Sequence, residues 1–327
     1  MWKNFIDSVN IVLPIFLLVV LGYILKRIKF ASDKFYADAE KFVFNIALPC
    51  QLFLNVAFEA RLGGEVDYIK LILFCVIAVT SAFLLGLIVV PLIVKDKGAC
   101  GAIIQNTFRS NFAVLGIPLA ANIAGSLGVA AISILMPFVI IMFNVYTIIE
   151  LNIFAPRETR KSIGQLVLSI LKSVITNPLI IAVLLGLPFL FSGWRIPSEL
   201  GFIEKTVSYL SDTTQALILV ALGAGFSFSA LKGKWRYSLP CAIYKVAVLP
   251  IIAVVIAHCA FGFSNVELAI IFVLFGSPSA VSSYIMAKTL KSDAEVAGQV
   301  LLLSTLLCIL TLFIGIFALK TLGWIVV

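Results

Sequence analysis

The sequence predicts an all-α integral membrane protein with ten transmembrane helices, arranged as two inverted five-helix repeats. Three observations predict it: an apolar composition, ten apolar runs long enough to cross a bilayer, and basic residues concentrated in alternate loops. Hydrophobic residues make up 62% of the 327 residues and charged residues 12%, against about 45–50% and about 25% in soluble domains. A bilayer accommodates this excess because lipid tails are as apolar as the side chains that face them.

A membrane-spanning helix needs about 20 mostly apolar residues. The chain contains ten such runs, at Phe5–Leu25, Tyr36–Phe58, Ile69–Val94, Ala99–Ile123, Val129–Phe154, Ile175–Phe191, Ser208–Phe228, Leu239–Phe261, Val266–Ala287 and Ala294–Leu319. The first run is too long for the core of a signal peptide and ends at basic residues. We therefore expect it to remain as a spanning helix. The amphipathic stretch Lys161–Val174 either lies along the interface or extends the sixth run.

The basic residues test this assignment, because cytoplasmic loops of membrane proteins are enriched in Lys and Arg. With the N-terminus outside, most Lys and Arg residues fall in the cytoplasmic loops. These are Lys26, Arg27, Lys29, Lys34, Lys95, Lys97, Arg157, Arg160, Lys161, Lys232, Lys234, Arg236, Lys288 and Lys291. We expect a multi-pass protein of the cell (plasma or inner) membrane with both termini outside the cytoplasm. The excess of basic residues, a net charge of +8, is then explained by the orientation of the chain in the membrane, and no nucleic-acid partner is expected.

Residue types needed for metal binding or catalysis are scarce. None of the six cysteines forms a C-x-x-C pair, and most lie in apolar runs, which is typical of small buried side chains. The chain has one histidine, no H-E-x-x-H motif, no paired intramembrane aspartates and no P-loop. We expect no metal site, no cofactor, no enzymatic activity and no direct use of ATP.

The ten runs divide into two halves at the basic loop 156–162. Residues 1–155 hold the first five runs and residues 163–327 the last five. An odd number of spans in each half forces the second half to insert upside down relative to the first. Inverted repeats of this kind are typical of secondary transporters, whose binding sites lie near the midplane where the repeats meet.

The fourth run of each half contains a helix-breaking triplet, Gly116-Ile117-Pro118 and Gly276-Ser277-Pro278. Proline removes a backbone donor and clashes with the preceding turn. A broken helix is tolerated in a membrane only where it lines a cavity or is buried in protein. The alternative is a pair of simple kinks, since Gly and Pro are common in membrane helices. The triplets alone leave both interpretations open.

Polar residues beside these triplets favour a binding site. Polar side chains at membrane depth are costly unless they meet a partner, a substrate or water. A half-helix N-terminus offers free N–H groups and a partial positive charge, which suit an organic carboxylate. The predicted substrate-binding residues are Gln51, Asn111, Gly116, Ile117, Pro118, Asn144, Gly276, Ser277, Pro278 and Ser279. For Asn111 the alternative is a hydrogen bond between helices.

Four ionisable residues in or near the runs have two interpretations each. Arg109 either attracts anions or extends to the interface, and for Lys245 the second interpretation is favoured. His258 lacks a neighbouring carboxylate in sequence, so a structural role is favoured over a proton relay. Asp212 is more readily an interfacial helix cap than a proton carrier. We see no acidic residue at the predicted breaks, so the sequence does not identify a coupling ion.

Several segments in order along the chain resemble the auxin efflux carrier family of permeases, particularly its bacterial malate- and malonate-permease-like branch. The resemblance is carried by Phe44–Phe58 with its Ala-Leu-Pro, Ser110–Gly128 with Asn and Gly-x-Pro, Thr176–Leu187 with Asn-Pro, Leu219–Leu231, Ser277–Leu290 and Leu302–Phe313. Two departures affect the substrate expectation. Residues 212–215 lack a proline that the family often has, and Arg109 stands where a smaller residue is expected.

The resemblance implies that broken helices four and nine cross at their breaks. It also implies that spans 3–5 and 8–10 form a moving transport unit, and that spans 1, 2, 6 and 7 form a scaffold that often makes the homodimer contact. The expected function is a secondary active transporter of small organic anions, such as mono- or dicarboxylates, working by alternating access. The expected partners are the anion, the lipid bilayer and a coupled proton or sodium ion. A sodium-coupled organic-anion symporter of the bile-acid type is the alternative.

Overall fold

The computed structural model describes residues 1–61, 64–155, 162–226 and 235–325, and every regular element in these ranges is helical. The α-helices are α1 (Trp2–Arg27), α2 (Asp33–Phe42), α3 (Leu48–Leu54), α4 (Tyr68–Ile93), α5 (Lys97–Phe108), α6 (Ile117–Phe154), α7 (Ile163–Ile175), α8 (Pro178–Ser192), α9 (Gly201–Asp212), α10 (Thr214–Ala224), α11 (Trp235–Ile243), α12 (Leu249–Phe261), α13 (Asn265–Gly276), α14 (Val281–Thr289) and α15 (Ala294–Thr321). Short π-helices are η1 (Val43–Ala47), η2 (Asn55–Glu59), η3 (Phe112–Gly116) and η7 (Tyr244–Val248), and η5 (Ser198–Leu200) is a 3₁₀ turn. The predicted central loop, apart from Ser162, lies outside the described residues, as do Lys232 and Lys234.

The helices are long and apolar enough for a membrane protein of many spans. The described residues contain seven such helices, or nine if the bent pairs α7–α8 and α13–α14 each form one span. The bends measure 54° and 40°. One of the seven, Lys97–Phe154, is 58 residues long and contains non-helical residues at Ala124 and Gly125. The polytopic all-α fold is confirmed, while the number ten stays a prediction.

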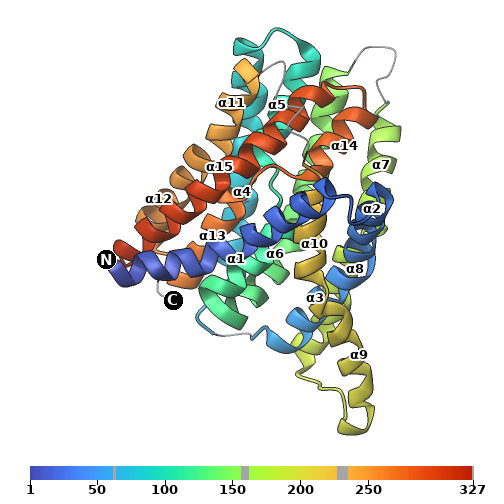
Figure 1. Cartoon of the computed structure of the whole chain (residues 1–327), viewed down its shortest axis with the longest axis vertical. Coiled ribbons are helices and arrows are strands. Elements are labelled where there is room, and N and C mark those ends of the chain that lie inside the picture. The colour runs from blue at the N-terminus through green and yellow to red at the C-terminus, as the bar shows by residue number, and fades with distance from the viewer. Residues whose placement is uncertain (62–63, 156–161, 227–234, 326–327) are drawn as a thin grey trace.

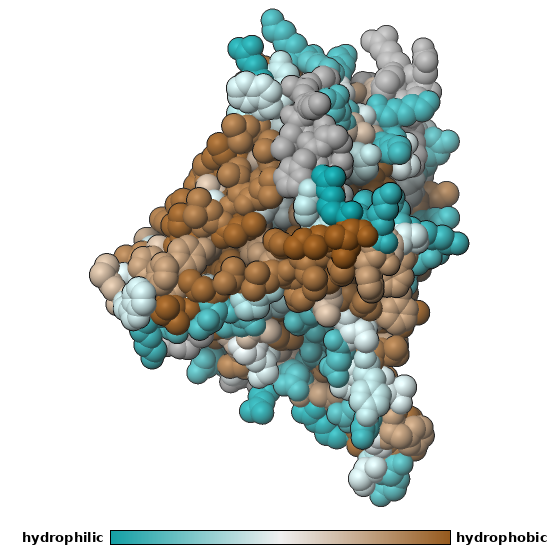
Figure 2. Space-filling view, in the orientation of Figure 1, coloured by the Kyte–Doolittle hydropathy of each residue, from teal (hydrophilic) through white to brown (hydrophobic). Residues whose placement is uncertain are grey.

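The outer surface of the bundle is apolar where a bilayer would contact it. Figure 2 shows apolar side chains gathered in a broad band over α1, α12 and α15, with hydrophilic residues on either side of the band. On α4 the exposed residues Ile69, Leu73, Ile77, Leu84 and Ile88 recur at the spacing of one helical face. Side chains of this kind, exposed in a continuous band, indicate contact with lipid.

The two ends of the chain lie close together (Figure 1). The Nζ of Lys320, near the end of α15, donates to Oδ2 of Asp7 on α1 at 2.6 Å. A chain whose ends lie at the same side of a membrane crosses it an even number of times. The ion pair therefore agrees with an even number of spans, as the sequence predicts.

Three of the π-helices end two residues before a proline. The π-helix η1 ends at Ala47 and precedes Pro49, η3 ends at Gly116 and precedes Pro118, and η7 ends at Val248 and precedes Pro250. Proline lacks the N–H that an α-helix requires and its ring clashes with a carbonyl one turn earlier. A π-turn widens the backbone at that point. These helices therefore continue through their prolines, where a break would otherwise be expected.

The helices α1 and α10 cross at backbone contact distance. A Cβ atom on Gly22 of α1 would overlap the carbonyl of Val220, and one on Gly223 of α10 would overlap the carbonyl of Val19. Small residues permit such close approach between membrane helices. The pair belongs to the first and seventh predicted spans, which the resemblance places together in the scaffold.

Candidate functional site

Two unwound segments face each other in the middle of the bundle. Arg109–Asn111 separates α5 from η3, and Ser277–Ala280 separates α13 from α14. The backbone N–H of Asn111 donates to the carbonyl of Pro278 at 2.7 Å. The prediction that the fourth and ninth spans are both interrupted is confirmed, and the two interruptions are in direct contact.

The predicted position of the first interruption is wrong. Gly116 ends η3 and Ile117 and Pro118 begin α6, so the backbone is helical there. The unwound residues lie about two helical turns earlier, at Arg109–Asn111. The physical reason is the π-turn η3, which accommodates Pro118 within a continuous helix. In the second half the predicted triplet does coincide with the break, because Pro278 lies within it.

Arg109 is a charged residue at this crossover. Its side chain is 6% exposed. It donates from Nη1 to Thr147 Oγ1 at 3.2 Å and to Met286 Sδ at 2.9 Å. It donates from Nη2 to Asn144 Oδ1 at 3.1 Å and to Ser282 Oγ at 2.9 Å. All four acceptors are uncharged, so Arg109 forms no ion pair within the described part of the chain. Extension of Arg109 to the interface is therefore wrong.

These four hydrogen bonds join the two halves of the chain that the sequence predicts to be repeats. Asn144 and Thr147 lie on α6 of the first repeat, whereas Ser282 and Met286 lie on α14 of the second. A buried guanidinium without a counter-ion is costly, because burial removes the hydration of the charge. The neutral hydrogen bonds hold Arg109 in place and leave its positive charge available to an anion.

A cavity of about 240 Å³ opens beside the guanidinium. Its polar lining comes from both repeats and is completed by aromatic and aliphatic side chains. The lining residues include Asn45, Arg109, Ser110, Asn111, Asn144, Asn177 and Ser282, with Phe44, Phe112, Phe143, Ile140 and Leu179 among the apolar ones. A mostly apolar cavity with a few convergent polar groups is the usual form of a small-molecule site.

Two buried groups of the cavity have no hydrogen-bond partner among the described residues. They are Nδ2 of Asn111, on a side chain 5% exposed, and Oγ of Ser110, also 5% exposed. Buried donors are nearly always satisfied in folded proteins. Unsatisfied donors next to a guanidinium that has no ion pair are able to hydrogen-bond a group with oxygen acceptors, such as a carboxylate.

The structure brings together only part of the predicted site. Asn111 and Asn144 line the cavity. The remaining predicted residues do not line it: Gln51, Gly116, Ile117, Pro118, Gly276, Ser277, Pro278 and Ser279. Of these, Pro278 accepts the hydrogen bond from the N–H of Asn111 with its carbonyl, and Ser279 donates its N–H to Ser304 Oγ at 3.1 Å. The cavity is also lined by Asn45, Asn177 and Ser282, which were not among the predicted substrate-binding residues. The Asn177-Pro178 pair could have indicated a helix start at this position, because Asn177 caps α8 with its side chain and Pro178 is the first residue of that helix.

Lys245 is buried in the second repeat. Its side chain is 0% exposed, and its Nζ donates to the carbonyl of Phe275 at 2.8 Å. Phe275 lies in the last turn of α13, next to the break. The favoured interpretation that Lys245 extends to the interface is wrong. The ammonium instead stabilises the C-terminal end of a broken helix, where the helix dipole is negative.

The other two ionisable residues lie outside the crossover cavity. His258 stacks on Trp324 with ring centroids 4.0 Å apart, and Asp212 is exposed where α9 ends. Neither residue lines the cavity.

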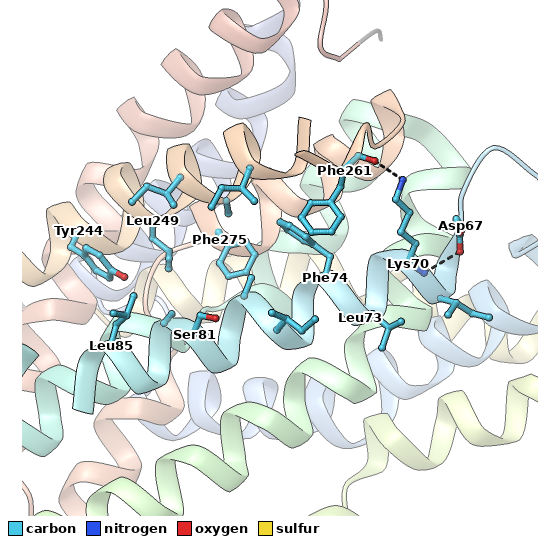
Figure 3. A pocket seen from close by; sticks show the side chains of 17 residues that line it. Asp67, Lys70, Leu73, Phe74, Ser81, Leu85, Tyr244, Leu249, Phe261 and Phe275 are labelled. Carbon is cyan, nitrogen blue, oxygen red and sulfur yellow. Dashed lines mark hydrogen bonds between the residues drawn. The ribbon is translucent and has the colours of Figure 1, made fainter. Parts of the chain in front are cut away.

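A larger cavity of about 710 Å³ lies between α4 and α12 (Figure 3). Its walls are almost entirely apolar, with Phe74, Leu249 and Phe275 among them. At one end Lys70 donates from Nζ to the carbonyl of Phe261 at 2.8 Å. None of its lining residues has a buried polar side-chain atom that lacks a hydrogen-bond partner among the described residues, and its apolar walls suit a lipid tail better than an anion.

Comparisons with known proteins agree with this arrangement. The profile of a family described as "Membrane transport protein" matches residues 7–316. An uncharacterized transporter of Methanothermobacter thermautotrophicus is 23% identical over 308 residues, covering 94% of this chain and 97% of that protein. An uncharacterized transporter of Methanocaldococcus jannaschii is 24% identical over 308 residues, covering 93% of this chain and 96% of that protein. The chain belongs to the membrane transport protein family, which is the auxin efflux carrier family of transporters.

Proposed function

We propose that this transporter carries small organic anions, such as mono- or dicarboxylates, and binds them at the crossover of the two broken helices. The observation that carries the proposal is Arg109, a buried cation without a counter-ion that lines a cavity between the repeats. Asn111 and Ser110 supply further donors with no partner among the described residues. A substrate carboxylate would neutralise the charge and accept these hydrogen bonds.

The cavity volume supports a small substrate. Pockets for drug-sized ligands measure about 300–1,000 Å³, whereas this cavity measures about 240 Å³. The phenylalanines in its wall would contact the carbon skeleton while the guanidinium binds the carboxylate. Short carboxylates therefore fit the site better than large amphipathic anions.

Alternating access follows from the position of the site between the repeats. The moving part consists of α4, α5, α6, α11, α12, α13, α14 and α15 in this proposal, and the scaffold consists of the remaining helices, which also form a homodimer contact. The protein resides in the cell membrane with both termini outside the cytoplasm. This orientation agrees with the basic loops of the sequence and with the adjacent chain ends.

A sodium-coupled symporter is the second candidate. It is favoured by buried oxygen atoms near the crossover that have no hydrogen-bond partner in the described ranges, namely Gln105 Oε1, Asn106 Oδ1 and Ser283 Oγ. Gln105 also donates from Nε2 to the carbonyl of Ser283 at 3.1 Å, so α5 and α14 are in contact there. Uncharged oxygens next to a broken helix are suitable ligands for sodium.

Uptake by reconstituted liposomes tests the proposal. The panel contains malate, malonate, lactate and an indole carboxylate, each with and without a proton or sodium gradient. We expect saturable uptake of at least one carboxylate that Arg109→Gln abolishes. Arg27→Gln is the matched control, because Arg27 is exposed and bonds Tyr23 of the same helix. Absence of uptake for every anion by correctly folded wild-type protein would exclude the proposal.

A further inference from the structure

A buried acid lies next to the proposed anion site. Glu150 of α6 is 0% exposed, and neither carboxyl oxygen has a hydrogen-bond partner among the described residues. Thr147 and Asn144 precede it on α6 at intervals of three residues, and both accept hydrogen bonds from Arg109. Residues three apart share a helix face. The expectation that no acid lies near the crossover is therefore wrong.

Glu150 and Arg109 interact electrostatically without a direct ion pair. A buried carboxylate with neither a hydrogen-bond donor nor a counter-ion is costly by several kcal/mol per charge. It can be neutralised in two ways, by taking up a proton or by contact with the guanidinium. In the present conformation Arg109 is bonded to four uncharged acceptors. A proton is then the means by which Glu150 is neutralised.

Few other ionisable groups act on Glu150. From α5, which packs on α6, the thiol of Cys100 interacts with it, and Asp96 caps that helix nearby. Glu267 of α13 is bonded to the N–H groups of Asp67 and Ser264 at the other end of the bundle. The described charged residues on the other helices packed against α6 and on α14 are exposed, paired or hydrogen-bonded elsewhere: Lys3, Asp7, Lys26, Arg27, Glu59, Lys70, Lys172 and Lys288. Lys97 at the start of α5 is exposed, as is Lys291, which follows α14 and lines a separate cavity with Leu151 and Asn152 of α6. Among the described charged groups, the attraction that acts on Glu150 comes from Arg109.

We propose that Glu150 carries the proton whose movement is coupled to anion transport. In the loaded state the substrate carboxylate binds Arg109 and Glu150 holds a proton. When the anion leaves, Arg109 turns to the Glu150 carboxylate and the proton is released to the same side. The empty carrier then returns with an internal ion pair in place of substrate and proton. This inference rests on the proposed function and names its coupling ion.

This cycle fixes the net charge that moves with each substrate. One proton moves with each anion and in the same direction. A monocarboxylate is therefore carried without net charge, while a dicarboxylate dianion carries one net negative charge. A one-unit pH gradient can then drive about a tenfold accumulation of a monocarboxylate, and the membrane potential should affect dianion uptake only.

The variant Glu150→Gln separates coupling from transport. Glutamine resembles the protonated acid in shape and charge, so the loaded carrier can still change its orientation. The empty carrier cannot form the internal ion pair. We expect Glu150→Gln to exchange labelled for unlabelled anion across the liposome membrane as fast as wild type. We expect it to lose accumulation driven by a pH gradient and to lose the proton uptake seen with an internal pH-sensitive dye.

Two further variants serve as controls. Glu150→Asp keeps a carboxyl group and should keep gradient-driven accumulation with an altered pH profile. Glu267→Gln changes a buried carboxyl far from Arg109 and should leave proton coupling intact. Accumulation by Glu150→Gln under a pH gradient, or wild-type accumulation that responds to sodium and not to pH, would overturn the inference and leave anion transport standing. Absence of both uptake and exchange in wild type would instead remove the proposed function.

Discussion

The backbone N–H of Asn111 and the backbone carbonyl of Pro278 are joined by a hydrogen bond of 2.7 Å. This bond connects the unwound segments of the two repeats through main-chain atoms alone. The carbonyl of Asn111 accepts from the N–H groups of Val114 and Leu115, so its backbone is fully engaged. Its side-chain amide, by contrast, has no donor interaction with a described residue. In the proposed function, the fold uses the backbone atoms of Asn111 and ligand recognition uses its side-chain amide.

This division predicts the behaviour of Asn111→Ala. The substitution keeps the backbone bond to Pro278 and removes only the free Nδ2 donor. A hydrogen bond to a charged group contributes about 1.5–3 kcal/mol, so the KM for anion uptake should rise about tenfold or more. The melting temperature in detergent should stay close to that of wild type. An unchanged KM would assign the Asn111 side chain no part in binding.

Arg109→Lys should fail although the charge is retained. A guanidinium offers donors in a planar fork, whereas an ammonium is a point charge with three donors. Lysine cannot reproduce four bonds to two helices on opposite sides. We expect uptake at least about tenfold slower, equivalent to about 1.4 kcal/mol. Uptake at the wild-type rate in the same liposome assay would show that only the positive charge matters.

Lys245→Met should destabilise the ninth span. Methionine keeps the length and apolar stem of the side chain but leaves the carbonyl of Phe275 without its buried partner. Losing one partner of a charged hydrogen bond costs about 1.5–3 kcal/mol. Thermal unfolding in detergent should show a lower melting temperature. Lys172→Met, at an exposed position, is the comparison and should melt with wild type.

Gly223→Ala should disrupt the crossing of α1 and α10. The new methyl group would overlap the backbone carbonyl of Val19, which cannot rotate away as a side chain can. The helices must separate, and the loss of packing should lower both folded yield and melting temperature. Gly164→Ala provides the control, because no atom lies within 4 Å of the added Cβ and alanine favours a helix by up to about 1 kcal/mol. Equal stability of the two variants would contradict the close crossing.

Composition and helix-breaking residues predicted the all-α membrane fold, but they placed only one of the two helix interruptions correctly. The second interruption was found because Pro278 lies in it. The first was misplaced because the π-turn η3 accommodates Pro118 in a continuous helix, while the unwound segment Arg109–Asn111 contains no glycine or proline. Helix-breaking residues show where a break is tolerated, but tertiary contacts such as Asn111 to Pro278 decide where it forms.

The site was predicted only where intramembrane polarity is conspicuous in sequence. Asn111 and Asn144 stand in apolar surroundings and line the cavity. Ser282 lies in a serine-rich stretch that does not show which hydroxyl faces Arg109. Glu150 lies near the end of a predicted span, where an acid is unremarkable. Its burial becomes evident only once α5 packs against α6.

The contact between Asp7 and Lys320 has a consequence for how this architecture is encoded. The polypeptide joins the end of the first half of the chain to the start of the second, and this ion pair between the first and last long helices joins the other two ends. Both pairs of ends of the two halves are therefore adjacent in space. The fold does not require the first half to precede the second in the sequence. A circularly permuted chain would have its present ends joined by a short linker and its new ends in the central loop. The second repeat would then come first in the sequence, and the chain would adopt the same fold.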